Sequence, residues 1–348
     1  MKLLLRRGVA GLLHASGAPL KRLRGKVCIL AYHRVLKDGQ LRPRALQPGM
    51  YVLEESFDRQ MRFLSKHCDV ISFPDLLGLW GERRWDGNGR YCVITFDDGW
   101  VDNYLNALPI LADHRLPATV FLTTSLIGTN RWFWPQRLGR LREHCLAQGV
   151  KTQSGGGRES IEDRVLSEMS ILLNYQGAGD AEMLDRAVES LKDCPERVIE
   201  QVLGELEERA GMAGTDERAL LNWDEVREMS EKGMSFGSHG SSHRIFTRLT
   251  VQEMENELVE SWESLQSPGV AAVPVLAYPN GDWNQKVEDM AAEAGYRAAV
   301  TTRFGLEGSA PKDLFALRRV CIHDDITSTV PTFAMRISGL LCKQTAEP

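Results

Sequence analysis

Short apolar runs alternate with longer amphipathic stretches along most of this 348-residue chain. The runs occupy residues 27–31, 70–73, 92–96, 118–123, 234–237, 273–277, 298–302 and 320–322. Strands that alternate with helices pair in parallel, because each helix returns the chain to the edge where the next strand starts. The pattern therefore predicts an α/β protein with a mostly parallel sheet, either open or closed into a barrel.

Helices are predicted between several of these runs. Asn222 and Glu225 have the spacing of a capping box, which marks the start of a helix. One helical face in 254–265 is apolar and is formed by Met254, Leu258, Trp262 and Leu265.

Residues 136–220 break the alternation. They contain no strand-like run and carry 17 acidic against 11 basic residues. We therefore predict a helical insertion that packs against the main domain or a partner, or else forms a solvated lid with no chemical role. Its apolar positions at helical spacing are Val165, Met169, Leu172, Leu173, Val198, Val202 and Leu206.

The first 26 residues carry seven Lys or Arg and no acid, interleaved with leucines. This segment (1–26) is a basic amphipathic leader, which either contacts an anionic membrane peripherally or is simply solvated. It matches a secretory signal poorly. The rest divides into a main domain in two pieces (27–135 and 221–335), the insertion (136–220) and a C-terminal tail (336–348). No run reaches the roughly 20 apolar residues that a membrane-spanning helix needs.

Net charge and cysteine spacing exclude two broad classes. A net charge of −5 and a pI near 6.0 argue against a nucleic-acid partner, because such surfaces need clustered positive charge. The seven scattered cysteines include no CxxC pair, so neither a disulfide framework nor a thiolate zinc site is indicated. These features favour a cytoplasmic protein, with the inner membrane as a peripheral location.

A pair of aspartates ends one of the apolar runs, in Thr95-Phe96-Asp97-Asp98-Gly99. Adjacent carboxylates repel each other unless a cation or a shared proton relieves them. A bound metal would let one carboxylate bind the ion while the other acts as a base. A helix cap beside a turn is the alternative for this short block.

Two histidines follow another run, in Ser238-His239-Gly240-Ser241-Ser242-His243. Histidines four residues apart can converge on one ion, and the small residues around them leave room for it. Together with Asp98 they supply one carboxylate and two imidazoles, a ligand set that keeps positions open for water and substrate. This set predicts a hydrolytic metal site.

In combination these blocks resemble the polysaccharide deacetylases of carbohydrate esterase family 4, the NodB homology domain, in order from about residue 27 to 330 without the insertion. The resemblance implies a distorted (β/α) barrel with fewer than eight repeats. It makes Asp97 the catalytic base and Asp98, His239 and His243 the ligands of a divalent ion, zinc first with cobalt or nickel as alternatives. Deacetylation of N-acetylated glycans is the implied activity.

The third motif departs from that family. Its usual Arg-Pro-Pro-Tyr-Gly is replaced here by Ala277-Tyr278-Pro279-Asn280-Gly281, which resembles the exopolysaccharide deacetylase subgroup. A backbone N–H of this loop can still stabilise an oxyanion, so the altered side chain at Asn280 is tolerable. Tyr278, Pro279 and Asn280 are candidate substrate contacts. The missing arginine leaves the base without an orienting cation, and we predict that Arg319 replaces it; an ordinary strand-end arginine is the alternative.

Three further residues are candidates for the site. His323, with Asp324 or Asp325 as orienter, matches the place of the family's general acid. His33 follows the first run, where a substrate contact or a supporting role is expected. Trp100, like Trp132, Trp134 and Trp283, is a candidate platform for a sugar ring.

Three functions remain open at this stage. The first is a metal-dependent deacetylase acting on an N-acetylated polysaccharide or a lipid-linked glycan precursor. The second uses the same site on an O-acetyl ester or a non-sugar amide. The third is an inactive glycan-binding protein, against which the four intact polar site residues weigh, because burying them without a ligand is costly.

Overall fold

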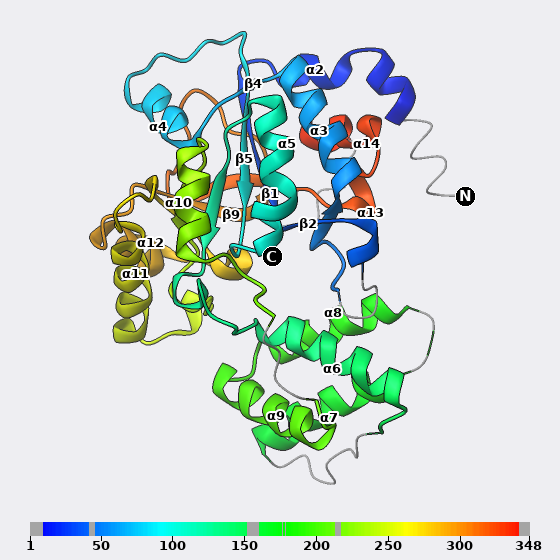
Figure 1. Ribbon diagram of the computed structural model, residues 1–348. Coiled ribbons are helices and arrows are strands. Elements are labelled where there is room, and N and C mark those ends of the chain that lie inside the picture. Colours follow the sequence, from blue (N-terminus) through cyan, green and yellow to red (C-terminus); the bar gives the residue numbers. More distant parts are fainter. Residues whose placement is uncertain are drawn as a thin grey trace. The chain divides into compact units, whose positions relative to one another are not determined.

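The computed structural model of the chain describes residues 10–41, 46–151, 160–175, 177, 179–212 and 217–340 (Figure 1). They form two compact units. The barrel unit contains the described parts of Met1–Lys37, Tyr51–Thr129 and Leu220–Pro348, and the helical unit those of Asp38–Met50 and Asn130–Ala219. The domain boundaries expected from the sequence run at 135 and 221 and leave residues 38–50 with the barrel; as a division into domains they stay a prediction.

Every strand of the described residues lies in the barrel unit. They are β1 (Lys26–Tyr32), β2 (Arg34–Leu36), β3 (Tyr51–Leu53), β4 (Asp69–Val70), β5 (Arg90–Phe96), β6 (Thr119–Leu122), β7 (Ser235–Ser238), β8 (Ala272–Ala277), β9 (Ala298–Phe304) and β10 (Leu317–Cys321). Its helices are α2 (Ala18–Arg22), α3 (Glu54–His67), α4 (Phe73–Gly81), α5 (Leu108–His114), α10 (Trp223–Glu231), α11 (Val251–Leu265), α12 (Gln285–Glu293), α13 (Asp324–Thr327) and α14 (Val330–Ile337).

A parallel sheet closes on itself in this unit. Its order is β1-β10-β9-β8-β7-β6-β5-β4, and β1 also pairs with β5 along its whole length, from Lys26 opposite Arg90 to Tyr32 opposite Phe96. This second pairing closes a barrel of seven strands, with β4 added outside on β5. The predicted distorted (β/α) barrel with fewer than eight repeats is confirmed.

The strands are apolar because both of their faces are covered. Six of the seven residues of β1 are buried, as expected for a parallel strand with helices on one face and the barrel interior on the other. One predicted run needs correction: β4 ends at Val70 rather than at residue 73. Ser72 and Asp75 form a capping box there, and with Pro74 in the first turn they start α4 instead.

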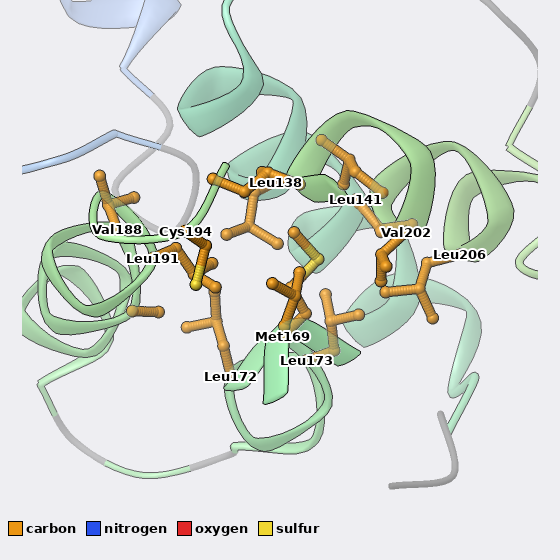
Figure 2. Close-up of a cluster of buried hydrophobic side chains, with 14 of the residues drawn as sticks. Leu138, Leu141, Met169, Leu172, Leu173, Val188, Leu191, Cys194, Val202 and Leu206 are labelled. Atoms are coloured by element: carbon orange, nitrogen blue, oxygen red, sulfur yellow. The ribbon is translucent and has the colours of Figure 1, made fainter. Parts of the chain in front are cut away.

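Four helices make up most of the helical unit: α6 (Trp134–Gln148), α7 (Ile161–Asn174), α8 (Asp180–Leu191) and α9 (Glu196–Arg209). Figure 2 shows their aliphatic side chains meeting in one cluster, with Leu138, Met169, Leu172, Leu191 and Val202 among them. The apolar positions of the insertion pack against one another in this cluster. Packing of the insertion against the main domain or a partner stays a prediction. A unit of this size can bury them without help, because each helix presents an apolar stripe to the next.

The described part of the basic leader is packed on the barrel unit. Leu23 and Pro19 are buried, and the Arg22 Nε–H donates to the Ser338 carbonyl at 2.9 Å, beside the end of α14. Residues 1–9 of the leader lie outside the described residues. Within the described ranges, no helix combines the length and apolar character required to cross a bilayer.

Candidate active site

The residues singled out from the sequence gather at one end of the barrel. Asp97 and Asp98 follow β5, His33 follows β1, His239 follows β7, Tyr278 follows β8 and His323 lies two residues after β10. All strands of the barrel are parallel, so their carboxyl ends lie on the same side. Closure of the barrel thus brings together segments that are far apart in the sequence, as in other parallel barrels.

Asp98, His239 and His243 converge on one point. Asp98 Oδ1 lies 3.5 Å from His239 Nε2 and 3.4 Å from His243 Nε2, and the ligand atoms of the three residues lie within 4.8 Å of one another. Ligands bonded to a tetrahedral ion at about 2.1 Å lie roughly 3.4 Å apart. The donor set and its spacing therefore fit a divalent first-row ion.

His239 is oriented by the barrel. Its Nδ1 hydrogen-bonds to the Ala277 carbonyl at 2.8 Å, which places the proton on Nδ1 and leaves the Nε2 lone pair for a ligand. Burial lowers the pKa of His239 to about 4, in spite of the nearby carboxylates of Asp97 and Asp98. The imidazole is therefore neutral at neutral pH, the form that binds metal.

Helix α11 holds the loop that carries His243. The Glu257 carboxylate accepts from the Ser242 backbone N–H at 2.8 Å and from the Ser242 hydroxyl, and Glu260 accepts from the Ser241 hydroxyl at 3.2 Å. Ser261 hydrogen-bonds to Ser238 at 2.6 Å. Positions 257, 260 and 261 lie on one helical face, so a single face supports the whole loop.

Asp97 is paired with Arg319. The guanidinium donates from Nη1 to Oδ1 at 2.7 Å and from Nη2 to Oδ2 at 2.8 Å, and both side chains are buried. Burial alone would raise the pKa of the Asp97 carboxyl, but the charge and hydrogen bonds of Arg319 outweigh it, and the pKa lies below its usual range. The cation expected from the sequence thus lies beside the expected base.

Arg319 is itself held inside the barrel. Its Nε–H donates to the Thr301 carbonyl at 3.0 Å, and its Cζ lies 5.8 Å from the Phe121 ring centroid. Phe121 also explains Gly237, where a Cβ would lie 2.6 Å from that ring. The glycine therefore makes room for the aromatic side chain of Phe121.

Asp98 has a different neighbour. Trp100 donates its indole N–H to Asp98 Oδ2 at 2.7 Å and is fully buried. A buried ring cannot stack on a sugar, so the expectation that Trp100 is a substrate platform needs correction. Burial would raise the pKa of the Asp98 carboxyl, but hydrogen bonding to His243 and the charges of the nearby histidines lower it well below its usual range.

Three site residues adopt left-handed backbone conformations. The φ angles of Asp98, His243 and Asn280 are 76°, 69° and 63°. Such angles are costly outside glycine, though least so for Asn and Asp, and they persist where surrounding contacts require them. All three lie in the loops after β5, β7 and β8, at the same end of the barrel.

The altered third motif divides between core and loop. The Tyr278 ring is buried, donates its hydroxyl proton to the Phe315 carbonyl at 2.9 Å and stacks with Trp283. Pro279 is buried as well, whereas Asn280 is exposed at the turn and donates from Nδ2 to Asp282 at 2.9 Å. Of these three candidate substrate contacts, Tyr278 and Pro279 need correction because their side chains are buried, whereas Asn280 is exposed.

His323 and His33 border the same site. His323 Nδ1 hydrogen-bonds to Asp325 Oδ2 at 3.0 Å, so Asp325 orients it; Asp324 instead accepts from Leu53 and Ser56 at the start of α3. Burial lowers the pKa of His323 below its usual value and outweighs the hydrogen bond and charge of Asp325, which act in the opposite direction. His33 Nε2 lies 4.0 Å from Asp97 Oδ2.

Sequence reasoning missed the groups that support the site. Glu257 and Glu260 look like ordinary exposed acids of an amphipathic helix. Arg34, whose Cζ lies 4.5 Å from the Trp100 ring centroid and whose Nε donates to Asp102 at 2.8 Å, belongs to no recognisable motif, and neither does Asp102. The only available signal was position, since Asp102 comes four residues after Asp98.

Comparison with known proteins identifies relatives of the barrel. The family model described as polysaccharide deacetylase matches residues 85–155 and 190–299, just over half of the chain. The Bacillus subtilis (strain 168) protein YxkH, whose name places it among polysaccharide deacetylases, is 20% identical over 304 residues, covering 87% of this chain and 74% of that protein.

Solved structures share the fold. The Streptococcus pyogenes deacetylase PplD in complex with acetate has a TM-score of 0.57 at 18% identity and covers 90% of this chain and 99% of its own. A de-N-acetylase from Aggregatibacter actinomycetemcomitans has a TM-score of 0.52 at 14% identity and covers 87% and 96%. At these sequence identities, the likeness shows that the fold is shared and nothing more.

Proposed function

This chain belongs to the polysaccharide deacetylase family, and on that premise we propose that it is a metal-dependent hydrolase that removes acetyl groups from an N-acetylated polysaccharide or a lipid-linked glycan precursor. The observation that carries the proposal is the convergence of Asp98, His239 and His243 next to the Asp97–Arg319 pair. Families of this kind generally use a divalent metal, and the ligand chemistry here suits zinc, with cobalt or nickel as alternatives.

Asp98, His239 and His243 would hold the ion. When bound, it would supply a Lewis acid that polarises the acetyl carbonyl and makes water a better nucleophile. Asp97 accepts the proton from the attacking water, and Arg319 keeps both carboxylate oxygens in place for that transfer. The loop after β8 supplies a backbone N–H at Asn280 for the oxyanion.

The departing amine needs a proton, and His323 is the proposed donor. Its Nδ1 is engaged by Asp325, so Nε2 is the atom that delivers the proton. A lowered pKa makes the imidazolium a stronger acid, which favours transfer to the leaving group. His33, near Asp97, is proposed to contact substrate or to support the base.

An N-acetyl substrate is supported by the relatives. The Aggregatibacter structure is described as a de-N-acetylase and the Streptococcus structure as a deacetylase holding acetate. An O-acetyl ester or a non-sugar amide would use the same groups, so only a substrate profile separates these alternatives. An inactive glycan-binding protein is disfavoured, since a buried Asp98 next to two imidazoles is costly without an ion.

The test combines metal content with acetate release. Purified protein is stripped with chelator, reloaded with Zn²⁺, Co²⁺ or Ni²⁺, and assayed on N-acetylglucosamine oligomers and on O-acetylated glycans. We expect release from the N-acetyl substrates only after reloading. Turnover that survives complete metal removal would exclude metal dependence, and release only from esters would favour the O-acetyl alternative.

Asp97→Asn is the deciding variant. It should bind the same amount of metal and lose about 10²- to 10⁴-fold in turnover, because the proton acceptor is gone. Asp289→Asn, which changes an exposed aspartate of α12, is the matched control and should retain full activity. Equal activity in both variants would remove Asp97 from the mechanism.

Contact with an anionic membrane through residues 1–26 is a further part of the proposal. Lys21, Arg22 and Arg24 are exposed in the described part of the leader, and Leu12 is 77% exposed. Clustered positive charge with an exposed apolar side chain favours anionic lipid. Co-sedimentation with phosphatidylglycerol vesicles but not phosphatidylcholine vesicles would support it; equal partitioning would contradict it.

A further inference from the structure

The two aspartates after β5 are held by different kinds of donor. Asp97 receives two hydrogen bonds from the cation Arg319, whereas Asp98 receives one from the neutral indole N–H of Trp100. A guanidinium offsets the charge of the carboxylate that it holds, but an indole leaves that charge in place. Asp98 therefore keeps its full negative charge beside the two imidazoles.

The indole also selects which oxygen of Asp98 faces the histidines. Trp100 Nε1 lies 2.7 Å from Oδ2, on the far side of the carboxylate from the histidine contacts, which are made by Oδ1 at 3.5 and 3.4 Å. The terminal torsion of an aspartate is broad, so without this bond the carboxylate could turn. The bond holds it with one oxygen presented.

Trp100 cannot move to follow such a turn. Its ring is fully buried, and Arg34 Cζ lies 4.5 Å from the ring centroid. Arg34 Nε in turn donates to Asp102 Oδ2 at 2.8 Å, and Asp102 Oδ1 accepts from the Val35 N–H at 2.8 Å. The Asp102 side chain is 3% exposed, so the chain of contacts is anchored in the protein interior.

Resting on the function proposed above, we infer that Trp100 is a positioning residue for the metal centre, and that Arg34 and Asp102 fix its ring. Trp100 touches neither substrate nor ion. It orients a ligand carboxylate so that Oδ1 reaches the ion, which raises metal affinity by removing unproductive orientations. The adjacent aspartates thus divide their roles according to the donor that each receives.

Metal affinity tests the inference directly. Metal-free wild type and Trp100→Phe are titrated with Zn²⁺ by competition calorimetry, and with Co²⁺ by its visible absorption. Phenylalanine keeps an aromatic ring below Arg34 and lacks the N–H. We expect the Kd for either ion to rise about 10- to 100-fold, and the Co²⁺ spectrum to change as the carboxylate turns.

Two further variants complete the test. Trp132→Phe is the control: it removes a tryptophan of the helical unit that also has an arginine near its ring, 4.3 Å from the centroid, but donates its N–H to the Glu217 carbonyl. Its metal affinity should equal that of the wild type. Arg34→Gln keeps the indole donor and loses the stacked cation, so its Kd should rise by only about two- to fivefold.

The possible failures are distinguishable. If the wild type binds neither Zn²⁺ nor Co²⁺, the proposed function and this inference both fall. If the wild type binds metal and releases acetate while Trp100→Phe keeps its Kd and Co²⁺ spectrum, only the inference is overturned. A lower melting temperature of metal-free Trp100→Phe with an unchanged Kd would show a purely structural role and overturn it too.

Discussion

The barrel unit buries a group of charged and polar side chains in addition to its apolar core, whereas the core cluster of the helical unit is apolar. At one end of the barrel Asp97, Asp98, His239 and Arg319 are all buried, and each has a defined polar partner. The core cluster of the helical unit consists of aliphatic, methionine and cysteine side chains, although Arg142 of α6 is buried too. Ion pairs such as Arg209 with Glu205 lie on its surface.

Buried charged groups and a buried apolar core stabilise a fold in different ways. A buried charge is tolerated only while its partner is present, so polar groups in the barrel are mutually dependent. An apolar core depends on volume and not on any one contact. The two units should therefore respond differently to substitution.

The largest effect is expected from breaking the buried pair. Arg319→Met leaves Asp97 without its cation and should lower the free energy of unfolding of the metal-free protein by about 3–5 kcal/mol. Adding Asp97→Asn should restore much of this loss, because no uncompensated charge remains. Denaturant titration of the three proteins checks it, and a loss below about 1 kcal/mol in the single variant would contradict the dependence.

A cavity in the helical unit should come next. Leu172 is fully buried in the cluster of Figure 2, so Leu172→Ala should cost about 2–5 kcal/mol through lost burial and an unfilled cavity. Its neighbour Ile171 is 54% exposed, and Ile171→Ala should change the unfolding free energy by less than about 0.5 kcal/mol. Equal losses would mean that this cluster is not the core of the unit.

Acid should weaken the barrel site through His239. Its pKa is near 4 in the folded protein against 6.5 in the unfolded chain, so the unfolded state binds more protons between these values. Stability is then fully present above pH 6.5 and is lost as pH falls towards 4, by about 2 kcal/mol at pH 5. Unfolding curves of metal-free wild type should show this loss, and His239→Gln should flatten it; parallel pH profiles would exclude His239 as the cause.

The smallest effect is expected at the exposed ion pairs of the helical unit. Arg209 and Glu205 form an i,i+4 pair at 3.5 Å with side chains 66% and 50% exposed. Glu205→Gln should change the free energy of unfolding by less than about 0.5 kcal/mol, because water and salt screen the pair. A loss near that of Arg319→Met would erase the distinction between the two units.

Local patterns in the chain were enough for much of the fold. Seven of the eight apolar runs coincide, within a few residues, with the seven strands of the barrel. The Asn222–Glu225 capping box begins α10 as expected. The strand expected at 70–73 is shorter, because the Ser72–Asp75 capping box starts α4 within that run. Each of these features depends on neighbours within a few residues, which a sequence displays.

The sequence by itself determined the alternation of strands and helices and the positions of Asp97, Asp98, His239 and His243 at strand ends. Only the tertiary structure decided which strands are neighbours, and so which side chains meet. The pairing of β1 with β5 and with β10 brings Arg319 to Asp97, although the two residues are 222 positions apart in the sequence. Trp100, which the sequence predicts to be a sugar platform, is buried and hydrogen-bonds to Asp98. Backbone periodicity is a local property, whereas the partner of a buried charge depends on barrel closure and strand register, which no short stretch of the chain contains.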